Sequence, residues 1–258
     1  MTLARVEDQG DRLVVVNMNA ARRGALSPDL YAAVGDAFAQ AADTRVRAVI
    51  LTSEGGFFCA GGDLNVLIER RALPVAERVN RIEGLHGLIR AIRASPVPVI
   101  AAVEGGAAGA GLSLALACDL IVAGHSAQFT AAYVKAGLVP DGGLTSALSR
   151  VLPRPLAMEI CLLGRPVEAE RMAALGVVNQ VGPDGQVDAA AHTLADALAR
   201  GPRRAQGTIR RLVSEAYESS EADQLTAEQF AMAQAQGGAE AGEGISAFLA
   251  KRRPEFGA

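Results

Sequence analysis

The sequence predicts an α/β fold, in which helices cover a largely parallel sheet and a helical extension follows. In the first half of the chain, short apolar runs rich in β-branched residues alternate with helical patterns, as in parallel strands joined by helices. From about residue 133 onward, the patterns become mostly helical. At 258 residues, half of them hydrophobic, the chain is long enough to bury a substantial core.

The alternation begins with two strands and the helix between them. Residues 12–18, with the apolar run at 13–16, predict a buried strand, and residues 46–52 predict a second one. Residues 27–42 predict an amphipathic helix, with Ser27 as its N-cap and Pro28 at its first helical position. This order is typical of one strand-helix-strand unit.

The next elements continue the same order. A long helical pattern covers residues 74–94, and the Pro-Val-Pro run at 96–98 ends it. Residues 99–103 predict a third strand, residues 109–117 a helix, and residues 119–123 a further strand.

The second half contains turn signals between helical stretches. Near its end, the Ala- and Gly-rich stretch 231–243 predicts two helices joined by Gly237-Gly238. The helical tail is expected to pack on the same body or on a neighbouring subunit.

Composition excludes several classes of function. The net charge of -3 and the lack of a basic stripe with interleaved aromatic residues argue against nucleic-acid binding. No apolar run reaches the ~18 residues of a membrane span, and the chain begins without a signal pattern. Cys59, Cys118 and Cys161 lack paired spacing and the histidines are scattered, so we expect no metal site and a reduced, cytoplasmic location.

Short arginine clusters occur along the chain, among them Arg203-Arg204 and Arg210-Arg211. No aromatic residues are interleaved with these arginines, and the clusters lie at helix ends or in helical patterns. We therefore interpret them as solvated charges.

Two glycine-rich segments, residues 55–64 and 105–112, are the strongest functional signal. Each follows a predicted strand and precedes a predicted helix, and so presents backbone N–H groups at a helix start. Asp63 is expected to be an N-cap, which leaves the amide of Gly62 free, and Ala110 supplies the second amide. Two such amides that converge would form an oxyanion hole, which predicts acyl or enolate chemistry. Neither segment has the Gly-Lys-Ser/Thr ending of a nucleotide phosphate loop.

Several motifs, in this order and spacing, resemble the enoyl-CoA hydratase/isomerase (crotonase) superfamily over nearly the whole chain. They are Arg22-Arg23-Gly24-Ala25-Leu26, residues 58–64, residues 103–119, Gln128-Phe129, residues 137–143 and residues 243–248. The resemblance implies a spiral of ββα units over residues 1–195 and a helical trimerisation region over residues 196–258. It also implies a homotrimer or a dimer of trimers.

The same resemblance implies an acyl-CoA thioester substrate, whose carbonyl oxygen lies between the amides of Gly62 and Ala110 while an enolate forms. Coenzyme A is then part of the substrate, and no separate cofactor is expected. The implied substrate-binding residues are Arg22 and Ala25 near the nucleotide, Ala60 and Leu64 along the adenine and pantetheine path, and Phe248 and Lys251 from the adjacent subunit. Asp63, Tyr133 and Leu138 are further candidates for substrate binding, and Tyr133 could orient the substrate or donate a hydrogen bond in the pocket.

Three residues indicate which reaction of the superfamily to expect. Hydratases of the family use two glutamates, and the corresponding positions here hold Ser113 and Tyr133. Neither side chain is a base near neutral pH. Asp141 matches the carboxylate of family members that isomerise unsaturated or ring-epoxide acyl-CoAs, and a single base suffices for isomerisation.

Other interpretations stay open at this point. Asp141 lies in a Pro-Asp-Gly sequence, which is a strong turn signal in any protein. A hydratase with unusual water-activating residues is the second candidate, and dehalogenation or thioester hydrolysis are further reactions of the superfamily. A catalytically silent acyl-CoA-binding homologue is the alternative from a different class.

Overall fold

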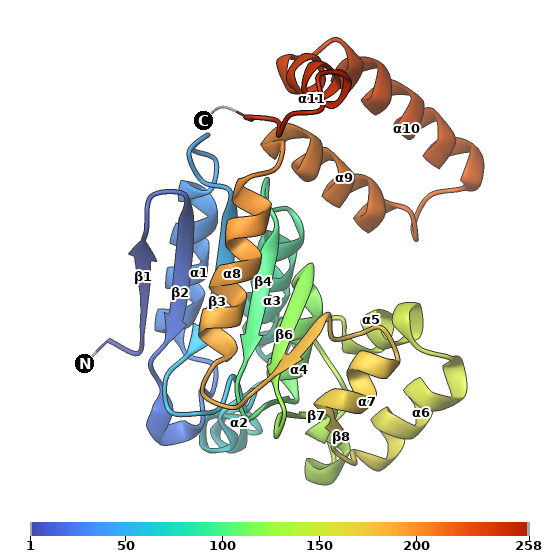
Figure 1. Cartoon of the computed structure of the whole chain (residues 1–258). Helices are drawn as coiled ribbons and strands as arrows, with labels where there is room; N and C mark the ends of the chain where they lie inside the picture. Colours follow the sequence, from blue (N-terminus) through green and yellow to red (C-terminus); the bar gives the residue numbers. More distant parts are fainter. Residues whose placement is uncertain (1, 257–258) are drawn as a thin grey trace.

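The computed structural model describes residues 2–256, so the outermost residues of both predicted regions lie outside it. A six-stranded sheet, in the order β1-β2-β3-β4-β6-β9, forms its centre (Figure 1). Strand β1 is antiparallel to β2, and the neighbours from β2 to β9 are parallel. The strands are β1 (Ala4–Asp8), β2 (Arg12–Asn17), β3 (Ala48–Ser53), β4 (Val99–Val103), β6 (Leu120–Gly124) and β9 (Gln180–Gly182).

Helices cover both faces of this sheet, which explains why its central strands β3, β4 and β6 contain continuous apolar runs. In β2, Val15 packs in the larger core cluster, whereas Val14 and Val16 pack in a second cluster on the opposite face. Helices α1 (Pro28–Gln40), α3 (Val75–Arg93) and α4 (Ala110–Ala117) contribute to the larger cluster, and α8 (Val187–Ala199) covers the second (Figure 1).

A smaller sheet lies beside the central one and includes part of the second glycine-rich segment. It has the order β5-β7-β8, with β5 (Gly106–Ala108), β7 (Gln128–Thr130) and β8 (Val167–Glu168). The short elements around the two sheets are the 3-10 helices η1 (Ala20–Arg22) and η2 (Ala132–Ala136) and the helices α2 (Leu64–Arg70), α5 (Leu144–Val151), α6 (Arg154–Leu163) and α7 (Ala169–Ala174).

The predicted α/β class is confirmed, and several predicted boundaries agree within one or two residues. Ser27 caps α1 by accepting a hydrogen bond from the Leu30 amide at 3.2 Å, and Pro28 is the first helical residue. Strand β4 has the predicted limits. Strand β9, in the mostly helical half, was not predicted, because its three residues are too few to show a period and only its pairing with β6 defines it.

The C-terminal helices α9 (Arg203–Glu215), α10 (Glu221–Gln236) and α11 (Ala239–Leu249) extend beyond one end of the central sheet (Figure 1). Gly237 ends α10 and Gly238 begins α11, so the predicted helix pair is confirmed. Many of their apolar side chains are exposed, among them Ile209, Val213, Leu225, Phe230, Met232, Ile245, Phe248 and Leu249.

Two arginines that we predicted to be solvated are tied to the core instead. The buried Arg210 donates to Asp119 at 2.5 Å and to the carbonyl oxygens of Ile92, Arg93 and Ser95. Arg203 donates to the carbonyl oxygens of Ala41, Asp43 and Val46. The sequence interpretation was wrong here because these acceptors are carbonyl oxygens from segments distant in the chain, which no local pattern reveals.

Across the described residues, the helices are too short or too polar for any of them to span a membrane.

Candidate active site

The two glycine-rich segments lie side by side and are hydrogen-bonded to each other. The Phe58 amide donates to the carbonyl oxygen of Glu104 at 2.9 Å, and the Ala108 amide donates to the carbonyl oxygen of Cys59 at 2.9 Å. Cys59 and Ala107 also form a parallel β-bridge. Although almost fifty residues separate the segments in sequence, the backbone of one therefore aligns the backbone of the other.

Glycines allow this close approach. A Cβ atom on Gly61 would lie 2.7 Å from the Ala108 carbonyl oxygen and 2.9 Å from the Ala110 nitrogen. Gly61 also has a φ of +88°, which favours glycine. On the other segment, a Cβ atom on Gly111 would lie 2.1 Å from the carbonyl oxygen of Cys59. These contacts bring the residue before Gly62 against the amide of Ala110.

The amides of Gly62 and Ala110 are the two predicted donors. Among the hydrogen bonds of residues 2–256, neither amide has an acceptor. Ala110 is the first residue of α4, where the positive end of the helix dipole lies. Asp63 caps α2 by accepting from the Asn65 amide at 2.9 Å, as predicted, so its side chain does not occupy the Gly62 amide.

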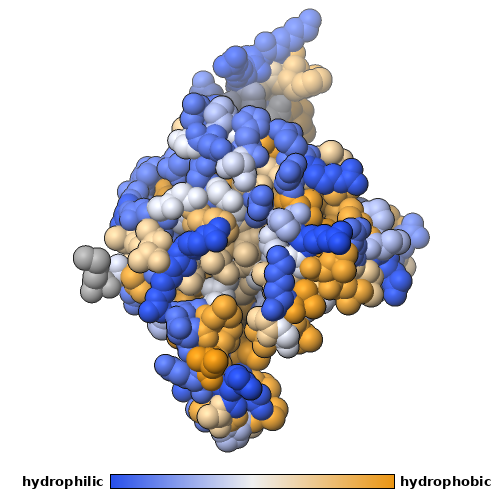
Figure 2. Space-filling view, turned by 90° about the horizontal axis from the view of Figure 1, so that it is seen from below, coloured by the Kyte–Doolittle hydropathy of each residue, from blue (hydrophilic) through white to orange (hydrophobic). Residues whose placement is uncertain are grey.

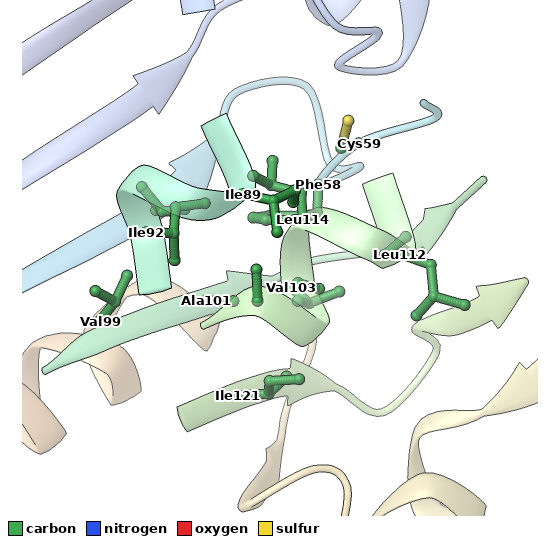
Figure 3. Packing of buried hydrophobic residues seen from close by; sticks show 14 of the residues in the cluster. Phe58, Cys59, Ile89, Ile92, Val99, Ala101, Val103, Leu112, Leu114 and Ile121 are labelled. Carbon is green, nitrogen blue, oxygen red and sulfur yellow. The ribbon is translucent and has the colours of Figure 1, made fainter. Parts of the chain in front are cut away.

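A packed apolar layer supports the loops. Phe58 from the first loop lies beside Leu114 of α4 and Ile89 of α3 (Figure 3), and Cys59 and Leu112 belong to the same buried cluster. Cys59 is fully buried, and burial raises the pKa of its thiol to about 12. The thiol therefore stays protonated near neutral pH and is a packing group, not a nucleophile.

Asp141 lies in a hydrogen-bonded cluster with the two residues at the positions of the hydratase glutamates. The Tyr133 hydroxyl donates to Asp141 Oδ1 at 2.7 Å, and the Ser113 hydroxyl donates to the Asp141 carbonyl oxygen at 2.9 Å. The Ser113 and Tyr133 oxygens are 3.3 Å apart. Burial, followed by the nearby Asp141 carboxylate, raises the pKa of the Tyr133 phenol, so Tyr133 remains a donor.

This cluster lies beside the second donor loop. Ser113 is on α4, three residues after Ala110. A Cβ atom on Gly109 would lie 4.0 Å from the Tyr133 ring. The Tyr133 ring, whose hydroxyl bonds to Asp141, therefore lies near Gly109, the residue that precedes Ala110.

The backbone of Asp141 takes part in the turn, and its side chain is free to join the hydrogen-bonded cluster. Gly142 and Gly143 have φ values of +60° and +75°, and the Leu144 amide donates to the Asp141 carbonyl oxygen at 3.2 Å. A Cβ atom on Gly142 would lie 2.9 Å from the Ser113 Cβ. The Pro-Asp-Gly sequence thus forms the expected turn, and that turn packs against α4.

The segment at residues 22–26, predicted to bind the nucleotide part, lies against the first loop. The Ala60 amide donates to the Arg23 carbonyl oxygen at 2.9 Å, and the Leu26 amide donates to the Gly61 carbonyl oxygen at 2.8 Å. The Arg22 guanidinium forms an ion pair with Asp63. These contacts gather the predicted residues Arg22, Ala25, Ala60, Asp63 and Leu64 around one loop.

The end of the molecule that bears α2 presents apolar patches between charged side chains (Figure 2). Leu64, Val66 and Ile68 of α2 are exposed, and Leu138 is 45% exposed.

Phe248 and Lys251 are not brought to this site by their own chain. Phe248 is on α11 and Lys251 follows it, at the opposite end of the sheet from α2 (Figure 1). Phe248 is 83% exposed. A role for these two residues therefore requires a second subunit.

Ser113 has a structural role that was not predicted from the sequence. We identified it only as the replacement of a glutamate, whereas its hydroxyl anchors the turn that carries Asp141. Its place one helical turn after Ala110 was the available signal. In residues 2–256, no three potential metal-ligating side chains come together.

Comparison with known proteins identifies the family. Residues 8–258 match the model of the enoyl-CoA hydratase/isomerase family. The chain belongs to this family. It is 37% identical to the 1,2-epoxyphenylacetyl-CoA isomerase of Escherichia coli over 237 aligned residues. The alignment covers 91% of this chain and 90% of that protein.

Other members of the family are named as hydratases. A probable enoyl-CoA hydratase of Rhodobacter capsulatus is 38% identical over 95% of this chain and 91% of its own length. The crystal structure of an enoyl-CoA hydratase from Polaromonas superposes with a TM-score of 0.94 and 41% identity, covering 97% of this chain and 98% of that one. The fold is thus that of the crotonase superfamily, and relatives of both names share it.

Proposed function

We propose that this protein is an isomerase of unsaturated or ring-epoxide acyl-CoA thioesters, in which Asp141 is the acid/base. The observation that carries the proposal is the composition of the cluster beside α4. Where hydratases of the family have two glutamates, this chain has Ser113 and Tyr133, and both hydrogen-bond to Asp141. One carboxylate can take a proton from one carbon and return it to another, whereas addition of water calls for a means of activating water as well.

For an unsaturated substrate, the proposed reaction moves a β,γ double bond to the α,β position. Asp141 takes a proton from the α carbon, and the electron pair of that C–H bond moves toward the thioester carbonyl oxygen to give a dienolate. The amides of Gly62 and Ala110 donate to this oxygen, and the dipole of α4 adds positive potential there. Asp141 then returns the proton to the γ carbon, and the thioester carbonyl re-forms.

The remaining predicted residues are assigned to substrate binding. Arg22 and Ala25 are proposed to lie near the nucleotide part of coenzyme A, and Ala60 and Leu64 along the path of its adenine and pantetheine, with Asp63 as a further binding residue. Tyr133 and Leu138 border the acyl part. Phe248 and Lys251 are proposed to come from the adjacent subunit of a homotrimer or a dimer of trimers, and we propose a cytoplasmic location. Coenzyme A enters as part of the substrate, and no other cofactor is proposed.

Hydration of 2-enoyl-CoA is the second candidate, because the relatives from Rhodobacter and Polaromonas are named hydratases. An assay of absorbance at the conjugated enoyl thioester band distinguishes the two reactions. With 3-enoyl-CoA, an isomerase creates the conjugation and the absorbance rises; with 2-enoyl-CoA, a hydratase removes it and the absorbance falls.

The variant Asp141→Asn tests the assigned base in the same assay. We expect its turnover of 3-enoyl-CoA to fall by roughly 10²- to 10⁴-fold, the usual contribution of a positioned acid/base. Asp36→Asn, at an exposed position on α1, is the matched control and should retain wild-type turnover. Unchanged turnover in Asp141→Asn would remove the proposed role, and a fall of absorbance with 2-enoyl-CoA alone would favour the hydratase.

A further inference from the structure

We propose that Tyr133 is a positioning residue that holds Asp141 Oδ1 and leaves Asp141 Oδ2 as the oxygen that exchanges the substrate proton. This inference rests on the proposed function, because it assigns the oxygen through which Asp141 acts. It refines the assignment of Tyr133 to the acyl part of the site: the ring borders that part, and the hydroxyl holds Asp141 and does not bind the substrate.

The geometry gives Asp141 two anchors of different kinds. The Ser113 hydroxyl, on the buried start of α4, holds the backbone of the turn through the Asp141 carbonyl oxygen at 2.9 Å. The Tyr133 hydroxyl holds the carboxylate through Oδ1 at 2.7 Å. Backbone and side chain of Asp141 are thus fixed by separate hydroxyls, and rotation of the carboxylate would break the second bond.

Counting protons shows which oxygen is free to react. Each hydroxyl has one proton: that of Ser113 is used on the Asp141 carbonyl oxygen, and that of Tyr133 on Oδ1. The 3.3 Å contact between the two hydroxyl oxygens then has no proton left to share. A proton arriving at Oδ1 would displace the Tyr133 proton, whereas a proton arriving at Oδ2 leaves all these bonds intact.

Oδ2 is also the oxygen that can be reached. Within residues 2–256 it has no hydrogen-bond partner, and it is not among the buried polar atoms that lack one, so it retains accessible surface. The Tyr133 phenol cannot replace it as a base, because burial raises its pKa. The proton taken from the α carbon therefore resides on Oδ2 and returns from Oδ2 to the γ carbon.

The hydrogen bond itself can be tested without turnover, by NMR of protein labelled with ¹³C at tyrosine Cζ. The chain has three tyrosines, and the Tyr133 signal is the one lost in Tyr133→Phe. Because Asp141→Asn replaces the charged acceptor of the Tyr133 hydroxyl by a neutral one, it should shift the Tyr133 Cζ signal at neutral pH. An identical Tyr133 Cζ signal in wild type and Asp141→Asn would overturn the proposed network.

The positioning role is tested by the kinetics of Tyr133→Phe with 3-enoyl-CoA. We expect kcat to fall by about tenfold or more, KM to change by less than about twofold, and the acid limb of the pH–rate profile to move to higher pH. If Tyr133 were needed only for packing, its substitution would not move the acid limb of the pH–rate profile and would not lower kcat while KM stays nearly unchanged. Tyr217→Phe, which removes an exposed hydroxyl bonded to the Arg150 carbonyl oxygen, is the matched control.

The outcomes separate this inference from the proposed function. If Asp141→Asn is inactive while Tyr133→Phe keeps wild-type kcat and pH profile, the positioning role is wrong and the function of Asp141 stands. If wild-type protein does not isomerise 3-enoyl-CoA, or Asp141→Asn is as active as wild type, the proposed function fails and the role of Tyr133 fails with it.

Discussion

At the scale of single residues, the site depends on glycines whose missing side chains leave room for a neighbouring backbone. Gly61 contacts Ala108 and Ala110, and Gly111 contacts Cys59. A side chain at either position would push the two loops apart, and the free amides of Gly62 and Ala110 would move with them. The distance between these amides is therefore set by residues that take no part in the chemistry.

We predict that Gly61→Ala lowers kcat/KM for 3-enoyl-CoA by roughly 10²-fold, as expected when a donor is displaced by ~1 Å. Its Cβ would lie 2.9 Å from the Ala110 nitrogen. Gly56→Ala is the matched control, because Gly56 lies in the same loop with a φ of +70° but has open space around it. Steady-state kinetics of both variants measure the effect, and equal losses would show that backbone strain, not displacement of the donor, is responsible.

Some residues of the candidate site could be predicted from the sequence, whereas the hydrogen bonds between them could not. Gly62, Ala110 and Asp141 could be predicted as candidates because glycine-rich helix starts and an acidic turn leave local signals. The bond from Tyr133 to Asp141 and the bond from Ser113 to the turn were not found. Each depends on how η2, α4 and the turn before α5 pack in space, which spacing along the chain does not specify.

At the scale of elements, helix α9 is attached to the core by one buried arginine. Arg210, whose side chain is 6% exposed, bridges α9 to the end of α3 and to Asp119 before β6. Its carbonyl acceptors, Ile92, Arg93 and Ser95, lie in and just after the last turn of α3, where helix carbonyl oxygens lack intrahelical partners. This side chain therefore connects the C-terminal helices to the central sheet.

We predict that Arg210→Met lowers the free energy of unfolding by about 3–5 kcal/mol, because it leaves Asp119 and several carbonyl oxygens without their donor. Arg211→Met is the control: Arg211 is 54% exposed and paired with Glu215 on the surface, so its loss should cost less than ~0.5 kcal/mol. Urea unfolding of both variants gives the comparison. Similar losses in the two would contradict the anchoring role.

The last described segment is attached to α11 through Glu243. Its carboxylate accepts hydrogen bonds from the two terminal nitrogens of the Arg252 guanidinium and from the Glu255 amide. The hydrogen bonds from Arg252 make the largest contribution, and together these bonds lower the pKa of Glu243 to about 2. Since the pKa is lower in the folded chain than its ordinary value of 4.5, the contact contributes fully above pH 4.5 and is lost as pH falls through about 2.

We therefore predict that the Glu255 amide keeps its protection from hydrogen exchange at pH 4–5, compared with Glu243→Gln at the same pH. In wild type, the protection should disappear as the pH approaches 2. Loss of protection already near pH 4.5 would show that the carboxylate titrates at its ordinary value and that the contact does not hold the segment.

At the scale of the whole molecule, the sequence indicated the α/β class and the helical C-terminal part, because long helices and apolar strands have clear periods. It did not indicate how that part is attached or which face it exposes. The apolar side chains of α9–α11 that remain exposed in one chain, such as Phe230 and Phe248, are what a subunit interface would cover.

We predict that light scattering gives a mass of three or six chains of 26.6 kDa. Phe248→Asp should reduce that mass, or raise KM for acyl-CoA if Phe248 contacts the substrate of the adjacent subunit. Thr226→Asp, on the same group of helices, tests whether any added charge has this effect. A monomeric wild-type protein with full activity would contradict both the assembly and the role of Phe248.

The most direct test of the whole account is a crystal structure of Asp141→Asn with 3-enoyl-CoA bound. The account predicts the thioester oxygen within about 2.7–3.1 Å of both the Gly62 and Ala110 nitrogens, as in an oxyanion hole. It also predicts the residue 141 side chain facing the α and γ carbons from one side. A thioester oxygen held by other groups, or a residue 141 side chain turned away from those carbons, would contradict it.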